Sequence, residues 1–194
     1  MTMKMKLLSA ITLAAAIVLP SQANAERYTI DTKGAHASIQ FRIQHLGYSW
    51  LNGRFNKFSG SFEYDDKQPS NASVHVEIDT ASIDSNHAER DKHLRGEDFL
   101  NVSQYPKARF ESNAFKENSD GSATLSGNLT LHGVTHPVNI RVSQIGHGSD
   151  PWGGYRRGFE GTTQISLQDY GINYNLGPKS KEVELTLSIE GIRQ

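Results

Sequence analysis

The stretch AHASIQFRIQH, residues 35–45, alternates small or apolar residues with polar ones at every second position. Ala35, Ala37, Ile39 and Phe41 share one parity, and the polar residues between them share the other. Because successive side chains of a β-strand point to opposite faces, this alternation predicts a strand with one face in a core and the other in water. The stretch therefore sets an all-β expectation for the fold.

The same period of two recurs along the chain. The runs ATLSGNLTL and VELTLSI alternate as regularly, and four further segments behave similarly: residues 74–78, 108–114, 138–142 and 159–167. Turn-forming sequences separate these runs at residues 65–71, 117–122, 132–137 and 146–154. About eight or nine antiparallel strands are expected. Because no long amphipathic helix is predicted to cover the sheet, it must close into a barrel or fold into a sandwich, and periodicity alone does not choose.

One charged segment interrupts the strand pattern. HAERDKHLRGEDF, residues 87–99, concentrates charges of both signs without alternation. Asn86 is placed to cap a short helix that Gly96 would end. We expect a helical insert around residues 86–101 that docks on the body through its apolar residues, Leu94, Phe99 and Leu100. A gate, an active site and a solvated connector are alternative roles for it.

The N-terminal residues have the pattern of a cleaved export signal. Lys4 and Lys6 precede an apolar run over residues 7–19, and small residues stand at positions −3 and −1 of a cleavage site after Ala25. The run is too short to span a membrane. We expect residues 1–25 to be removed and residues 26–194 to form a single exported domain without a membrane span.

Composition narrows the function classes. The formal charge is −1 and becomes −3 when Lys4 and Lys6 are removed, and no basic run supports nucleic-acid binding. The absence of cysteine excludes thiol nucleophiles and thiolate metal sites. His132 and His136 are four apart, but Gly133 makes their segment a turn rather than a helix that pairs ligands. No GxSxG or HExxH motif occurs. We therefore expect no enzyme activity, no metal site and no catalytic residues.

The predicted inward faces contain large residues beside alanine and glycine, which suits either a filled barrel or one that holds a ligand. His45 has inward parity at a strand end, as a core histidine or as a polar contact at a cavity mouth. Tyr48, Trp50 and Phe55 follow it as a plug or a lid. Arg157 and its neighbour Arg156 are either surface charges or an anion site.

Four sequence blocks together resemble the YceI-like family. They are IDTASIDSNHAERDKHLRGEDFLNVSQYPKARFES (residues 78–112), GNLTLHGVTHPV (127–138), PWGGYRRGFEG (151–161) and ISLQDYGI (165–172). The resemblance covers the whole chain after the predicted signal in order, and the first block is its most specific part. Gly96 departs from the serine common in the family, and NLGPKSKEV replaces a shorter acidic turn before the last strand.

The resemblance implies a lipocalin-like eight-stranded antiparallel β-barrel with an elongated interior pocket. It also implies export to the bacterial periplasm and binding of a polyisoprenoid, an isoprenoid quinone or another long-chain amphiphile. Dimers occur in the family, so a homodimer is one expected state. No catalytic residue set or cofactor is implied. A hollow barrel is thereby favoured over a filled one.

We expect this protein to carry or store such a lipid in the periplasm, with transient contact to a membrane or membrane protein. The expected lining is apolar and comes from five strands: Ile39, Phe41, Ile43, Val76, Ile78, Phe110, Leu125, Leu129, Phe159 and Ile165. The expected headgroup contacts at the mouth are His45, Arg90 and His93. The alternatives are an enzyme acting on a lipid or quinone with His93 or His45 as acid/base, and a filled barrel that acts as a stress or interaction protein.

Overall fold

A computed structural model describes residues 25–194 of the protein. Residues 1–24 of the predicted signal segment lie outside the described residues. The described chain holds one α-helix, α1 (Ala88–Leu94), and three short 3-10 helices, η1 (Pro69–Asn71), η2 (Thr80–Ser82) and η3 (Leu167–Tyr170). Its strands are β1 (Glu26–Ile30), β2 (Ser38–His45), β3 (Ser49–Phe55), β4 (Phe58–Tyr64), β5 (Ser73–Asp79), β6 (Ile83–Asp84), β7 (Lys107–Glu117), β8 (Ala123–Leu131), β9 (Val134–Ser149), β10 (Tyr155–Ser166) and β11 (Glu182–Arg193).

Eight strands form a closed ring in the order β1-β4-β5-β7-β8-β9-β10-β11, and β1 pairs back with β11 to complete it. Tyr28 faces Arg193 and Ile30 faces Gly191 in this closing ladder. Every pairing in the sheet is antiparallel. The predicted eight-stranded antiparallel barrel is confirmed.

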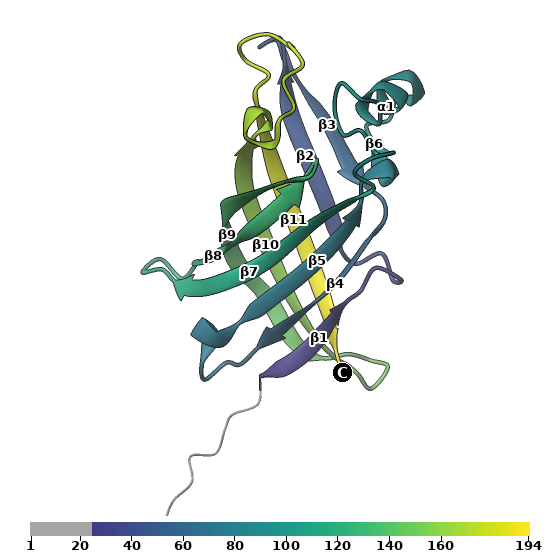
Figure 1. Cartoon of the computed structure of the whole chain (residues 1–194). Coiled ribbons are helices and arrows are strands. Elements are labelled where there is room, and N and C mark those ends of the chain that lie inside the picture. The colour runs from purple at the N-terminus through teal and green to yellow at the C-terminus, as the bar shows by residue number, and fades with distance from the viewer. Residues whose placement is uncertain (1–24) are drawn as a thin grey trace, which may run out of the picture.

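Strand β11 pairs with two different strands, β1 and β2, along one edge. Its C-terminal end pairs with β1, whereas its N-terminal half pairs with β2 in a register that sets Val183 opposite Ile43. Strand β3 continues from β2, and the short β6 pairs with β3. These three strands extend the wall beyond the eight-stranded ring, toward the upper end in Figure 1.

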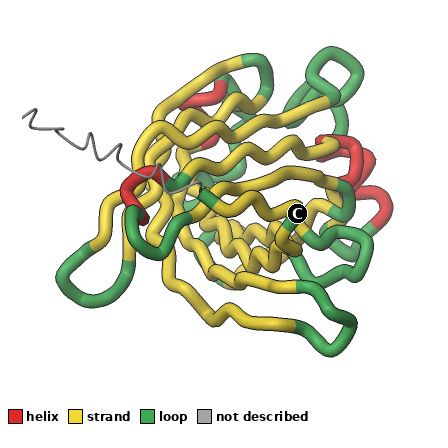
Figure 2. Tube along the Cα trace, turned by 90° about the horizontal axis from the view of Figure 1, so that it is seen from below, coloured by secondary structure: helices red, strands yellow, loops and turns green. Residues whose placement is uncertain are grey.

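The two ends of the barrel differ. We call the upper end in Figure 1 the mouth, because α1, the β2–β3 hairpin and the segment of residues 173–181 lie there. We call the opposite end the floor; it carries the C-terminus, which faces the viewer in Figure 2. No helix within residues 25–194 is long and apolar enough to cross a membrane.

Two predicted boundaries are wrong for local backbone reasons. Strand β2 begins at Ser38, because Ala35 has a φ of 57° in a turn and is exposed, so its side chain does not face the lumen. Strand β9 runs from Val134 to Ser149, so the turns at its two ends are shorter than the predicted turns at residues 132–137 and 146–154. The β8–β9 turn consists of His132 and Gly133, both with positive φ.

The helical insert is present, but its cap lies one residue later than predicted. His87 is the N-cap of α1, and its Nδ1 accepts the backbone N–H of Arg90 at 3.2 Å. Asn86 instead takes a φ of 61°, which asparagine tolerates better than most residues. Arg95 donates to the carbonyl oxygens of Ala81 and Ile83 at 2.7 and 2.6 Å, which fastens the insert to the barrel wall.

Three inward phenylalanines lie against glycines instead of filling the lumen. A Cβ placed on Gly127 would lie 2.5 Å from Cζ of Phe110, so the ring occupies the space that a side chain would need. The same relation holds for Phe41 on Gly53 and for Phe62 on Gly191. Gly127 therefore provides the space that the Phe110 ring occupies, and it is not open space for a ligand.

Replacing Gly127 by alanine is expected to lower the free energy of unfolding by about 1–3 kcal/mol, because the methyl group meets both the Phe110 ring and the Glu111 carbonyl oxygen at 2.5 Å. Urea unfolding followed by circular dichroism measures the change. Gly148→Ala is the matched control, since its added Cβ meets nothing within 4 Å. Equal stabilities for the two variants would contradict the ring-on-glycine interpretation.

Candidate functional site: an apolar cavity with a polar mouth

The barrel encloses two adjoining apolar chambers. The lower chamber has a volume of about 130 Å³, and the upper one, on the mouth side, about 300 Å³. Four residues line both chambers and form the neck between them: Ile39, Ile78, Leu129 and Leu185. The barrel is thus not filled by its own side chains, in contrast to one of the alternatives left open by the pattern.

All ten residues expected to line a tunnel lie on the walls of these chambers. Val76, Phe110, Leu125 and Phe159 border the lower chamber. Phe41, Ile43 and Ile165 border the upper one. Ile39, Ile78 and Leu129 border both. That these side chains contact a ligand stays a prediction.

Sequence reasoning missed the contribution of the early strands and of the mouth segments. Phe62 and Tyr64 of β4 line the lower chamber, and Leu51 and Phe55 of β3 line the upper one. The inward face of β4 could have been predicted from FSGSFEY, because its aromatic residues Phe58, Phe62 and Tyr64 share one parity. By contrast, the mouth residues Ile172 and Leu176 lie outside any strand, so no periodicity pointed to them.

Arg90 borders the upper chamber from α1 and is held in place by hydrogen bonds. Its Nε donates to Ser85 Oγ at 2.7 Å and its Nη2 donates to the Ser85 carbonyl oxygen at 2.6 Å. Ser85 Oγ in turn donates to the buried carboxylate of Asp91 at 2.5 Å. This chain fixes a cationic guanidinium beside an otherwise apolar chamber.

His93 joins the insert to the segment on the other side of the mouth. Its Nε2 lies 3.1 Å from Asp98 Oδ2, and its ring meets the rings of Phe99 and Tyr174 edge-on at 4.9 and 5.3 Å. His45 also borders the upper chamber, but it is exposed at the end of β2 and is not a core histidine. The structure thus brings His45, Arg90 and His93 to one end of the cavity.

The aromatic residues after His45 neither plug nor cover the barrel as expected. The side chain of Tyr48 is 87% exposed and that of Trp50 is 41% exposed. Trp50 lies on the outside of the wall, with the guanidinium of Arg42 4.3 Å from its ring centroid. Of the three aromatics, Phe55 alone borders a chamber.

The floor contains a buried cation that the sequence did not reveal as such. Arg157 is 1% exposed and binds the Asp66 carboxylate through both terminal nitrogens, at 2.9 and 2.6 Å. Its guanidinium lies 4.6 Å from the ring of Tyr64, which borders the lower chamber. Burial lowers the pKa of Arg157, but hydrogen bonds to Asp66 and Tyr28 outweigh it and raise the pKa above its ordinary value. Arg157 is neither a surface charge nor free for an anion.

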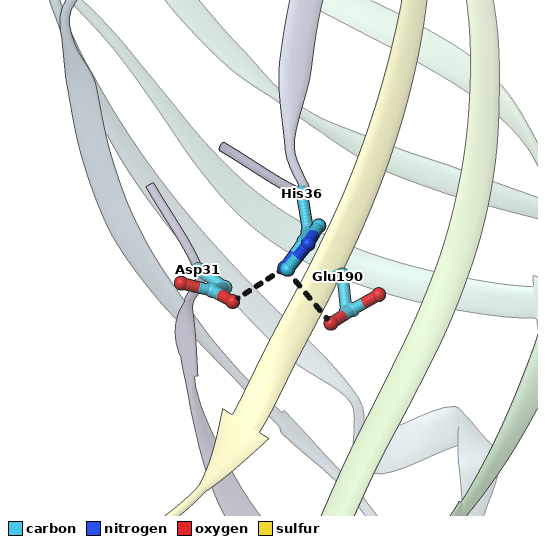
Figure 3. Close-up of side chains that lie close together, drawn as sticks. All are labelled: Asp31, His36 and Glu190. Carbon is cyan, nitrogen blue, oxygen red and sulfur yellow. Dashed lines mark hydrogen bonds and ion pairs between the residues drawn. The ribbon is translucent and has the colours of Figure 1, made fainter. Parts of the chain in front are cut away.

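A second ionic cluster near the floor has the composition of a metal site. Asp31, His36 and Glu190 bring three potential ligand atoms within 4.8 Å of one another, and Figure 3 shows His36 between the two carboxylates. However, the Arg156 guanidinium already donates to Asp31 at 2.7 Å, to Asp150 at 2.8 Å and to Glu190. The hydrogen bond from Arg156, followed by those from His36 and Gly34, lowers the pKa of Asp31 to about 2. Because a metal ion would have to displace this guanidinium, we interpret the cluster as an ion-pair network.

Together, the closed antiparallel ring and its apolar interior define a lipocalin-like barrel with a cavity. The YceI-like domain model matches residues 28–191. The chain belongs to the YceI-like family.

Curated relatives cover almost the whole chain. A UPF0312 protein from Pseudomonas aeruginosa (strain LESB58) is 60% identical over 189 residues, which is 97% of this chain and 98% of that protein. A UPF0312 protein from Shewanella sp. (strain W3-18-1) is 52% identical over 192 residues, covering 99% of this chain and all of the relative.

Solved structures share the fold at low sequence identity. BcnA from Burkholderia cenocepacia is similar with a TM-score of 0.73 and 21% identity, covering 83% of this chain and 98% of BcnA. A polyisoprenoid binding domain from Saccharophagus degradans, implicated in plant cell wall breakdown, is similar with a TM-score of 0.62 and 15% identity, covering 86% of this chain and 98% of that domain. These likenesses show a common barrel.

The ion-pair network predicts a pH dependence of stability. The pKa of Asp31 is lower in the folded protein, about 2, than its ordinary 3.8, so its contribution is complete above about pH 4 and is lost as the pH falls through about 2. Asp31→Asn should lower the free energy of unfolding at pH 7 by about 1–2 kcal/mol, and its difference from the native protein should vanish in acid. Urea titrations at several pH values measure this, with the exposed Asp169→Asn as control. A constant difference at all pH values would refute the assignment.

Proposed function

We propose that this protein binds a long-chain amphiphile, a polyisoprenoid or an isoprenoid quinone, inside the barrel and carries it through the periplasm. The observation that supports this most is the adjoining pair of apolar chambers with polar side chains gathered at the mouth. Burial of each methylene of a chain in such a cavity contributes about 0.8 kcal/mol. A hydrocarbon chain would enter first, and its polar head would stay near Arg90 and His93.

Two further observations support a lipid of this class. The Saccharophagus degradans domain that shares the fold is described as binding polyisoprenoids, which makes an isoprenoid chain our first choice for this cavity. The export signal predicted over residues 1–25 supports the periplasm as the compartment. The homodimer implied by the family resemblance stays a prediction.

We propose binding and not catalysis. The residues that border the upper chamber include no hydroxyl and no carboxylate side chain, and its polar members are His45, Arg90 and His93 at the mouth. His93 is engaged with Asp98, and Arg90 with Ser85. This arrangement suits a fixed head of the ligand better than a proton transfer in the upper chamber.

Extraction of lipid from the purified exported protein, followed by mass spectrometry, tests the function. We expect a prenyl-chain amphiphile at close to one molecule per chain. Leu129→Trp should reduce that occupancy at least tenfold, because Leu129 borders both chambers and the larger ring would block the neck. Asn128→Trp places the same ring on the exposed face of β8 and should leave the lipid in place. Native protein that is always empty would refute the proposal.

The position of the head can be tested with ligands that differ only there. Arg90→Met is expected to weaken binding of a polyprenyl phosphate about tenfold, because a charge-assisted hydrogen bond is lost. Binding of squalene, an isoprenoid hydrocarbon without a polar head, should stay unchanged. Fluorescence competition measures both, and Arg54→Met on the exposed face of β3 serves as control. An equal loss for both ligands would place the head elsewhere.

A further inference from the structure

Exposed apolar side chains gather at the mouth of the barrel. We define the mouth rim as residues 45–50 of the β2–β3 hairpin together with residues 173–181 before β11. The described chain has six exposed large hydrophobic residues, and four of them belong to the mouth rim: Leu46, Tyr48, Trp50 and Tyr174. Such side chains in one place on a surface mark an interaction site more often than scattered ones do.

The two parts of the mouth rim are joined and border the cavity. Ser180 Oγ donates to the Gln44 carbonyl oxygen, which fastens the segment of residues 173–181 to the end of β2. His45 from the hairpin and Leu176 from the other segment both border the upper chamber. The exposed apolar surface is therefore continuous with the entrance to the lipid cavity.

The charge of the mouth rim is opposite to that of the chain. The whole sequence has a formal charge of −1, yet the rim contains no aspartate or glutamate. It does contain Lys179 and Lys181, and both are exposed. Aromatic residues combined with lysines in this way are typical of segments that lie in the interface of a membrane with anionic lipids.

Two of the acids that flank the mouth rim have side-chain partners. Glu184 pairs with Arg42 at 2.6 Å, and Asp98 lies 3.1 Å from His93. Glu182 is the first residue of β11 and directly follows Lys181 in the sequence. It is an exposed acid next to the rim. The positive charge therefore belongs to the rim itself, because the insert at the same end of the barrel carries four acidic residues against three basic ones over residues 87–99.

The tip of the hairpin holds its leucine in an unfavourable backbone conformation. Tyr48 N–H donates to the His45 carbonyl oxygen at 2.9 Å, and the two residues between them, Leu46 and Gly47, have φ values of 52° and 83°. A turn with positive φ at both central positions favours Asn-Gly, because leucine is strained in the left-handed region. Leu46 Cδ2 lies beside Gly177 of the other rim segment, yet the side chain remains 52% exposed.

We propose that the mouth rim docks on the surface of an anionic phospholipid bilayer, so that the cavity opens toward the membrane. Leu46, Tyr48 and Tyr174 enter the headgroup layer, while Lys179 and Lys181 lie beside lipid phosphates. This orientation gives a lipid ligand a path between bilayer and barrel that avoids water. The inference rests on the proposed function for its biological purpose, but the docking surface itself rests on the exposure and charge of the rim.

Vesicle cosedimentation with the full exported chain tests the docking. One set of vesicles contains equal amounts of phosphatidylglycerol and phosphatidylcholine, and the other contains phosphatidylcholine alone. The native chain should bind the anionic vesicles at least tenfold more strongly, and salt should weaken this binding. Each lysine near an anionic surface contributes about fivefold, so Lys179→Glu combined with Lys181→Glu should reduce binding at least 25-fold.

The apolar part of the surface is tested with a variant that does not threaten folding. Leu46→Asn places the favoured residue at the strained position, so a combined Leu46→Asn and Tyr48→Ser variant should stay folded yet lose at least tenfold in vesicle binding. Trp152→Ser is the matched control, because Trp152 is 78% exposed in the β9–β10 hairpin at the floor. All variants have the same N-terminal residues, so a difference in vesicle binding between them results from the substituted residues.

Rim variants that bind as tightly as the native chain, or an equal loss in Trp152→Ser, would overturn the proposal. Native protein that binds neither kind of vesicle would also overturn it and would leave a protein partner as the occupant of the rim. The lipid content of the same samples separates this inference from the proposed function. Docking variants should still carry extracted lipid, whereas empty protein that binds vesicles would contradict only the function.

Discussion

The pairing of β1 with β11 closes the hydrogen-bond ladder, and the rest of the molecule depends on this closure. An open sheet would have to bury its apolar face against a second layer. In the closed ring, the backbone ladder itself holds the opposite walls apart, so the interior need not be filled. Phenylalanines that lie against glycines of the wall preserve that space. Closure thus converts an ordinary apolar strand face into the lining of a cavity.

The two ends of the ring carry different chemistry, which gives the cavity a direction. At the floor, Arg157 is buried and bonded to Asp66, and its guanidinium lies over the ring of Tyr64, which borders the lower chamber. At the mouth, the polar groups border the upper chamber but stay close to solvent, and the rings of His93, Phe99 and Tyr174 join the insert to the segment of residues 173–181. A chain with one polar end fits this asymmetry in a single orientation.

The prediction from sequence succeeded where periodicity determines the orientation of a side chain. The residues of β2, β5, β7, β8 and β10 that were predicted to face inward border the chambers, because alternate residues of a strand must face the same side. It failed where the backbone leaves the strand pattern, as at Ala35, or where a neighbouring strand supplies the occupant, as with Phe110 over Gly127. Arg157 was misjudged because an inward arginine needs Asp66, which lies 91 residues away along the chain.

The sequence by itself determined the strand pattern, the apolar face and, through its motifs, the family. Those properties are local or are written in short blocks of residues. Only the tertiary structure decided that the face encloses two chambers, that His45, Arg90 and His93 meet at one end, and that Tyr48 and Trp50 point outward. These facts depend on which distant strands pair and in which register, and a period of two carries no information about that choice.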